Sequence, residues 1–206
     1  MAFTHLHVHT EFSLLDGSSK IKEIVAQAKK LNMDSLAITD HGVLYGAVAF
    51  YKECKAQGIK PIIGCEVYVA PRSRFDKVHG LDSDRYHLIL LCKNEKGYQN
   101  LLKLVSSAWV DGFYTKPRVD RDILEKYSEG LIALSGCLFG EVAQKILSRN
   151  IDDAKATALW YKNTFGSDNY YLEVQNHGMV EEKEVLDGIV LISRELNIPM
   201  VATNDV

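Results

Sequence analysis

Short apolar runs alternate with stretches of helical periodicity along the whole sequence, and this alternation limits the folds that the chain can adopt. Strands are expected at 3–9, 35–39, 62–70, 87–92, 131–134, 170–174 and 200–203. Helices are expected between them, at 19–31, 47–57, 95–107, 140–147, 151–165 and 180–196. Strands separated by helices form parallel βαβ units, so the sequence predicts an α/β protein with a barrel or a doubly wound sheet.

Two segments interrupt this rhythm without dividing the chain. Residues 72–84 are rich in charge and glycine, and residues 109–121 combine aromatic residues with cations, so both are predicted to be surface loops. No linker, repeat or low-complexity tract separates two parts of the sequence. With 47% apolar residues in a chain of 206, residues 1–206 can bury a core as one domain.

The composition excludes several classes of protein. The sequence has no basic start followed by a long apolar run and no stretch of membrane-spanning length, which favours a cytoplasmic protein without a membrane partner. The net charge of −3 lacks the basic balance that neutralises many phosphates, so a contact with DNA must be local or metal-assisted. The cysteines are widely spaced and form no Cys-x-x-Cys pair, which fits reduced thiols at Cys54, Cys65, Cys92 and Cys137.

The strongest local signal is the alternating triplet His5, His7 and His9. Alternation along a strand puts all three imidazoles on one face. Three imidazoles on one face make a poor apolar core, so a metal site is favoured over a structural role. Asp16 follows in a turn that could fold back over the strand end, although an acid near a helix N-terminus is an equally good interpretation from the local sequence.

Metal-capable residues recur within or directly after the later predicted strands. They are, in chain order, Asp40 with His41, Glu66, Cys137, His177 and Asp205. Most stand at carboxyl ends, where (β/α) barrels carry their active sites, and this position favours the barrel over the doubly wound sheet. His87 stands at the front of its apolar run instead, and the sequence offers no reason for that position.

This mixture of imidazoles, carboxylates and a thiol suits Zn²⁺, Mn²⁺ or Fe²⁺ better than Ca²⁺ or Mg²⁺, which prefer oxygen ligands. The candidates exceed the coordination shell of one ion, so two or three divalent metal ions are predicted. Such a cluster suits attack on phosphorus, because the ions activate water and hold the attacking and leaving oxygens. Phosphate loops of the Gly-rich type and Gly-x-Ser-x-Gly elbows are both missing from the sequence.

Seven motifs in order connect the chain to a known family. They are 6–17 (LHVHTEFSLLDG), 38–42 (ITDHG), 64–68 (GCEVY), 86–91 (YHLILL), 135–137 (SGC), 173–178 (EVQNHG) and 202–205 (ATND). With them the chain resembles the polymerase and histidinol phosphatase (PHP) family over essentially its whole length. Segments 94–102 (NEKGYQNLL) and 112–118 (GFYTKPR) look specific to the branch at the front of bacterial replicative polymerases, the DNA polymerase III alpha subunits.

The resemblance implies a distorted seven-stranded (β/α) barrel of the PHP type, similar to a TIM barrel, with a centre of up to three metals. The implied ligands, through which the domain would act catalytically, are His7, His9, Asp16, His41, Glu66, His87, Cys137 and Asp205. His5 lies outside that pattern, which revises the first interpretation of the triplet. His177 is expected to contact a substrate phosphate or to support a ligand. The family completes its last motif as Asp-x-His, so the resemblance implies a truncated N-terminal piece of a longer polymerase.

The function implied is phosphodiester hydrolysis, as 3′-to-5′ exonuclease proofreading at the primer-template 3′ end. Expected partners are therefore DNA, the remainder of the polymerase alpha subunit and replisome proteins, and this fragment alone is not expected to polymerise. Lys116 and Arg118 are expected on a loop near the substrate path, where they would bind the DNA backbone, with a solvated loop as an equal alternative. A non-catalytic scaffold of the polymerase and a small-molecule phosphatase or pyrophosphatase stay open as other functions.

Overall fold

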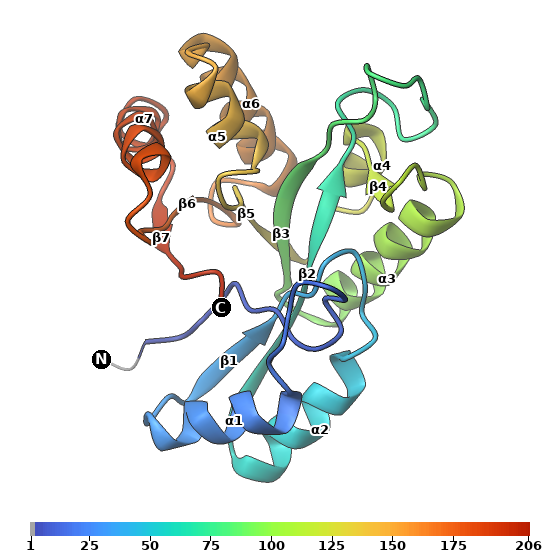
Figure 1. The fold of residues 1–206 in the computed structure, drawn as a ribbon, viewed down its shortest axis with the longest axis vertical. Coiled ribbons are helices and arrows are strands. Elements are labelled where there is room, and N and C mark those ends of the chain that lie inside the picture. Colours follow the sequence, from blue (N-terminus) through green and yellow to red (C-terminus); the bar gives the residue numbers. More distant parts are fainter. Residues whose placement is uncertain (1–2) are drawn as a thin grey trace.

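The computed structural model describes residues 3–206 (Figure 1). The strands of this part of the chain are β1 (Ser35–Ile38), β2 (Lys60–Val69), β3 (Tyr86–Cys92), β4 (Arg118–Val119), β5 (Leu131–Leu134), β6 (Tyr170–Val174) and β7 (Met200–Ala202). Its helices are α1 (Ile21–Lys30), α2 (Ala47–Gln57), α3 (Glu95–Val110), α4 (Arg121–Lys126), α5 (Glu141–Leu147), α6 (Ile151–Phe165) and α7 (Val180–Leu196). The predicted α/β class is confirmed, and α2, α6, α7, β5 and β6 have the predicted bounds.

The strands of residues 3–206 form one seven-stranded sheet in the order β1-β2-β3-β5-β6-β7, with β4 paired to β2. β1 and β2 pair in parallel, as do β5, β6 and β7, whereas β3 runs antiparallel to both of its neighbours. The prediction of parallel strands throughout is therefore wrong at β3. The segment 72–84 is an irregular loop, as predicted, and a loop without a crossover helix returns the chain in the opposite direction.

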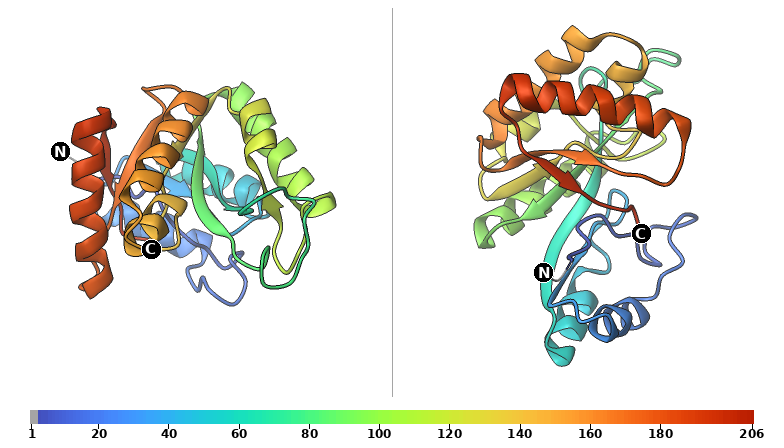
Figure 2. Two further views of the ribbon diagram at one scale, coloured as in Figure 1. Left: turned by 90° about the horizontal axis from the view of Figure 1, so that it is seen from above. Right: turned by 90° about the vertical axis from the view of Figure 1, so that its left-hand side faces the viewer.

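The sheet is strongly curled, and the N-terminal segment lies across its open side (Figures 1 and 2). The prediction of a strand at 3–9 is wrong, because this segment forms no continuous ladder of hydrogen bonds with a neighbouring strand. It connects the two edges of the sheet instead. The amide of Thr39, after β1, donates to the carbonyl of Val8 at 2.9 Å, and the amide of His9 donates to the carbonyl of Val206, after β7, at 2.6 Å. The distorted, barrel-like closure thus depends on segments at both ends of the chain.

Helices cover the outer face of the sheet (Figure 2). Leu88 and Leu90 of β3 belong to the large outer core with α3 to α7, whereas Ile89 and Leu91 belong to a small cluster with Ala37. Because side chains alternate along a strand, the small cluster marks the inner face of the curled sheet. None of the helices in residues 3–206 has the length and apolar character that a membrane crossing needs.

The segment 109–121 is more ordered than the predicted surface loop, since it contains β4 and leads into α4. Arg118 of β4 has no exposed surface, and its guanidinium donates to the carbonyls of Gly112 at 3.1 Å and Asp76 at 2.7 Å. The same group reaches the carbonyls of Asp82 and Arg74, at 3.0 and 3.2 Å. The expectation of a DNA-binding cation at Arg118 is wrong, because its donors hold the loop 72–84 against α3.

Candidate metal centre

A single buried carboxylate, that of Glu66, stands at the centre of the site. Glu66 lies on β2 between Cys65 and Val67, which face the outer core, so alternation turns its side chain to the inner face. It has no exposed surface. Four imidazoles approach its two oxygens, at 3.4, 3.3, 2.6 and 3.0 Å, from His7, His9, His41 and His87 respectively.

The atoms in these contacts are close together, but their geometry is not that of hydrogen bonds. Both oxygens of Glu66 and the Nδ1 of His41 are buried and lack a hydrogen-bond partner of acceptable geometry among the described residues, despite the short separations. A buried carboxylate left in this way is costly. Nitrogen and oxygen atoms that converge on a common point rather than on each other form the donor set of a metal site, so the residues fit divalent ions.

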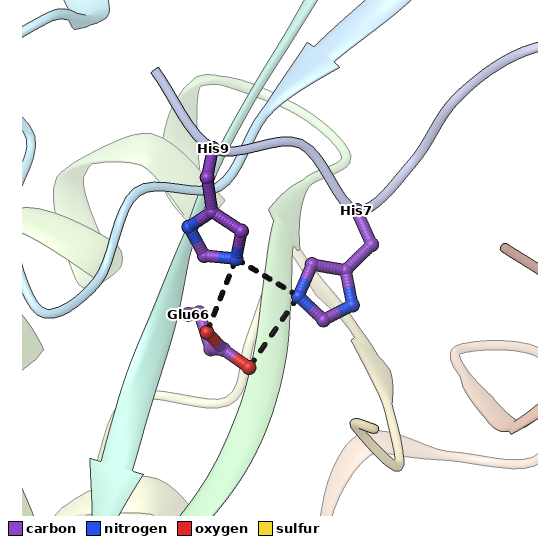
Figure 3. A group of neighbouring side chains, drawn as sticks. All are labelled: His7, His9 and Glu66. Atoms are coloured by element: carbon purple, nitrogen blue, oxygen red, sulfur yellow. Dashed lines mark hydrogen bonds and ion pairs between the residues drawn. The ribbon is translucent and has the colours of Figure 1, made fainter. Parts of the chain in front are cut away.

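The first group of the site is His7, His9 and Glu66, drawn in Figure 3. The N-terminal segment supplies the two histidines, whose Nε2 atoms are 3.1 Å apart and both point towards Glu66. Asp205 follows β7 and brings its Oδ1 to 3.2 Å from each of the same two nitrogens. The backbone bonds between the two chain ends therefore bring His7, His9 and Asp205 together, and β2 supplies Glu66 to the same point.

The second group is His41, Glu66 and His87. His41 follows β1, and His87 begins β3 opposite Tyr68 of β2. The reversed direction of β3 explains why His87 stands at the front of its run, because the start of an antiparallel strand lies beside the ends of its parallel neighbours. The sequence could not show this, since hydrophobic periodicity carries no information on strand direction.

Two further predicted residues border this second group. The Oδ2 of Asp16 lies 2.6 Å from the Nε2 of His41, so the turn after the N-terminal segment folds back over the site, which is one of the two interpretations that the local sequence left open. The Sγ of Cys137 lies 3.7 Å from the Nδ1 of His87. Burial, followed by the charge of Glu66, raises the pKa of the Cys137 thiol. That thiol would need a bound cation to lose its proton near neutral pH.

Three residues whose supporting role the sequence pattern did not reveal fix the orientation of two imidazoles. The Nδ1–H of His7 donates to Oε1 of Glu173 at 2.8 Å, because a carboxylate can only accept. The Nδ1–H of His9 donates to the hydroxyl of Ser13 at 2.9 Å, and that hydroxyl donates to Asp40 at 2.8 Å. With Nδ1 protonated, the Nε2 lone pair of each neutral imidazole faces the centre, as in many metal sites.

The carboxylates make this part of the molecule strongly negative. Burial lowers the pKa of His9, but the contacts with Asp205 and Glu66 outweigh it and raise the pKa to about 9. Burial likewise opposes a charge on His7, and the Glu173 carboxylate leads the contacts that raise its pKa well above the usual value. A field that favours extra protons on these rings equally favours divalent cations.

The remaining candidates have different surroundings. His5 packs edge-on against Phe3, with ring centroids 4.9 Å apart, and belongs to neither of the two groups described above. The Nδ1 of His177 lies 2.6 Å from Glu182, and its Nε2 lies 2.6 Å from the carbonyl of Asn204. Both nitrogens of His177 are therefore engaged within the chain, which favours support of the neighbouring Asp205 over contact with a substrate phosphate.

A cleft of about 1050 Å³ opens beside the second group. Asp16, His41 and His87 lie on its wall, and the aliphatic and aromatic side chains around them include Leu14 and Tyr68. Lys116 is also on the wall, with its Nζ 5.5 Å from the centroid of the Tyr68 ring. Lys116 thus lines the cleft beside the second group, and its place near the substrate path and its contact with DNA stay predictions.

The family described as the PHP domain matches residues 5–177. The chain belongs to the PHP domain family. This PHP domain is 53% identical to the DNA polymerase III subunit alpha of Borreliella burgdorferi. The alignment extends over 204 residues and covers 98% of the chain. It is 50% identical to that of Treponema pallidum and 49% identical to that of Thermus aquaticus, each over 100% of the chain.

The PHP domain spans only 18% of the length of the Borreliella and Treponema subunits. Solved structures agree with its fold. A protein described as a metal-dependent phosphoesterase, from Bifidobacterium adolescentis, matches with a TM-score of 0.58 at 14% identity, over 98% of this chain and 86% of its own. An amidohydrolase from Chromobacterium violaceum, solved with bound sulfate and no metal, matches with a TM-score of 0.57 at 14% identity, over 98% of this chain and 87% of its own.

Proposed function

We propose that this PHP domain hydrolyses phosphodiester bonds with bound divalent metals, as a 3′-to-5′ exonuclease that proofreads for an attached polymerase. The observation that carries the proposal is the sharing of Glu66 between two histidine groups next to an open cleft. The proposal includes one domain at 1–206 within a longer cytoplasmic polymerase. Its partners would be the primer-template 3′ end, the remainder of the alpha subunit and replisome proteins.

The ligand set proposed for two or three ions of Zn²⁺, Mn²⁺ or Fe²⁺ is His7, His9, Asp16, His41, Glu66, His87, Cys137 and Asp205. Ions held by these residues would activate a water molecule and neutralise charge on the phosphoryl oxygens. Glu66 would contact both histidine groups, and Glu173 would keep His7 in the orientation that faces the centre. Lys116, at the edge of the same cleft, would bind the DNA backbone.

The experiment is a nuclease assay with the protein loaded separately with each metal. A 5′-labelled 3′-recessed DNA should shorten stepwise from its 3′ end, and a chelator should stop the reaction. Elemental analysis of the same anaerobically purified sample should give two or three ions per chain. If the protein releases phosphate from free phosphomonoesters but leaves the DNA intact, it is a small-molecule phosphatase and the proposal is wrong. If the protein neither binds metal nor hydrolyses any of these substrates, it is a non-catalytic scaffold of the polymerase.

A further inference from the structure

The wall of the cleft carries an unusual set of exposed aromatic side chains. Trp109, Phe113 and Phe139 are 42%, 44% and 62% exposed, and all three line the cleft beside His41 and His87. Single exposed aromatic residues are ordinary on a protein surface, whereas several around one concave site indicate a ligand with flat apolar faces.

These aromatic rings are held in fixed positions relative to the second histidine group. The indole N–H of Trp109 donates to the carbonyl of Gly42, next to His41, at 2.8 Å. Phe113 stacks on Trp109 with ring centroids 5.5 Å apart. Phe139 packs against His87 with ring centroids 5.4 Å apart. One aromatic surface thus adjoins His41 and another adjoins His87.

The cations of the cleft suit a polyanion. Lys116 lies over the Tyr68 ring, and Tyr68 stacks on His41 with ring centroids 5.7 Å apart. Arg85 also lines the cleft, and within residues 3–206 neither cation forms an ion pair with an acid. Asp16 and Asp84 line the same cleft, but neither forms an ion pair with Lys116 or Arg85, so the two cations attract phosphate locally in a chain of net charge −3.

We propose that the cleft binds the unpaired 3′ end of single-stranded DNA, with bases stacked on Phe139 and on the Trp109–Phe113 pair and with Lys116 on a backbone phosphate. This inference rests on the proposed phosphodiesterase function and names its substrate form. In a duplex the bases are stacked on each other, and their flat faces are hidden from protein side chains. Stacking on aromatic residues together with backbone cations is the way in which proteins bind single strands without reading their sequence.

The first test measures binding rather than hydrolysis. A fluorescein-labelled (dT)12 is titrated with the protein in a chelator, and fluorescence anisotropy reports binding. Phe139→Ala and Phe113→Ala should each weaken binding roughly tenfold. Phe75→Ala is the matched control, because Phe75 is 59% exposed but lies outside the cleft wall, and it should bind as the unaltered protein does. Thermal melting of each variant shows that the fold is retained.

Two further probes separate stacking from charge. An abasic strand of the same length should bind more weakly than (dT)12 and should be insensitive to Phe139→Ala. Lys116→Ala should lower the salt dependence of binding by a slope of about one, whereas the phenylalanine variants should leave that slope unchanged. Equal binding of the abasic strand and (dT)12, or unaltered binding by both phenylalanine variants, would overturn the inference.

Hydrolysis assays distinguish this inference from the proposed function. With metal present, Phe139→Ala should raise the KM for single-stranded DNA, whereas the control Phe75→Ala should leave this KM and the hydrolysis of methyl p-nitrophenyl phosphate unchanged. Aromatic-dependent binding without hydrolysis of any phosphodiester would support the strand site and overturn the proposed function. Metal-dependent hydrolysis of DNA that is indifferent to both phenylalanine variants would overturn the strand site alone.

Discussion

Glu66 contributes to both histidine groups, so its replacement tests the whole site at one residue. Glu66→Gln keeps the size of the side chain and removes the charge that faces four imidazoles. We expect bound metal to fall at both positions and hydrolysis to fall by roughly two orders of magnitude or more. Elemental analysis and the nuclease assay measure the two effects. Full metal content in Glu66→Gln would contradict the shared-ligand assignment.

Glu173 tests whether a residue can strengthen metal binding by orienting a ligand without contacting the metal itself. Its Oε1 holds the Nδ1 of His7, and its Oε2 accepts the amide of Gly136 at 3.0 Å. Glu173→Gln should weaken metal affinity about 10- to 100-fold while the number of ions at saturation stays the same. Competition with a chromogenic chelator gives the affinity. A lost ion at saturating metal would instead make Glu173 a ligand.

Cys137 is the proposed ligand with the most ordinary alternative, a buried inert thiol. Cys137→Ser should lose metal from one position, preserve the others and lower hydrolysis without preventing folding. Cys92→Ser is the matched control, because Cys92 is half-buried at the far end of the strand that begins near His87. Full metal occupancy and full hydrolysis in Cys137→Ser would show that the thiol only packs.

The sequence predicted the proposed metal ligands better than it predicted the residues that hold those ligands in position. Residues such as His41 and Asp205 could be found because they follow apolar runs, and strand ends gather at one edge of a barrel. Glu173 could not be found in this way, because it lies inside a predicted strand, where an acid is usually solvated. Its partner His7 is 166 positions away in sequence, and a contact of that range depends on the closed fold.

At the scale of whole elements, His177 connects the start of α7 to the segment after β7. The carbonyl of Asn204 and the carboxylate of Glu182 raise the pKa of His177 above its usual 6.5, because both accept hydrogen bonds from the ring. Stabilisation by a raised pKa is complete below the unfolded value and is lost as pH rises through the folded value. The difference in Tm between the unaltered protein and His177→Ala should therefore shrink with rising pH.

That difference is measured by thermal melting in a chelator between about pH 6 and pH 9. Both proteins retain the other histidines, so their titration cancels in the comparison. A Tm difference that is constant over this range would contradict the protonated bridge. The metal affinity of His177→Ala should also fall, because the segment that carries Asp205 loses an anchor on α7.

Strand direction is the element-level property that the sequence could not supply. The bounds of β5 were predicted because a four-residue apolar run stands between polar turns, and those of β6 because aromatic and aliphatic residues surround a single acid between polar residues. The reversal of β3 follows only from the connection 72–84, which Arg118 holds through backbone carbonyls. A lone arginine in a predicted loop is usually accessible to solvent, so the sequence predicted contact with DNA or a solvated loop for Arg118 and not this packing.

At the scale of the whole molecule, closure of the sheet and assembly of the site are one event. The amide of His9 donates to the carbonyl of Val206 at 2.6 Å, and the amide of Val206 donates to the carbonyl of His7 at 3.1 Å. These bonds connect the first and last described segments, and Asp205 lies within the second of them. The proposed ligands from both chain ends therefore meet only when the curled sheet is closed.

Asp205 allows ligation to be separated from closure, because its backbone has a positive φ of 49°. Asparagine tolerates this left-handed conformation better than alanine does. Asp205→Asn should lose metal at the His7–His9 group and keep the hydrogen bonds of closure, whereas Asp205→Ala should lose metal and also loosen closure. Hydrogen exchange at the amides of His9 and Val206 measures the difference. Equal loss of protection in both variants would show that the carboxylate itself, and not the backbone conformation, holds the two chain ends together.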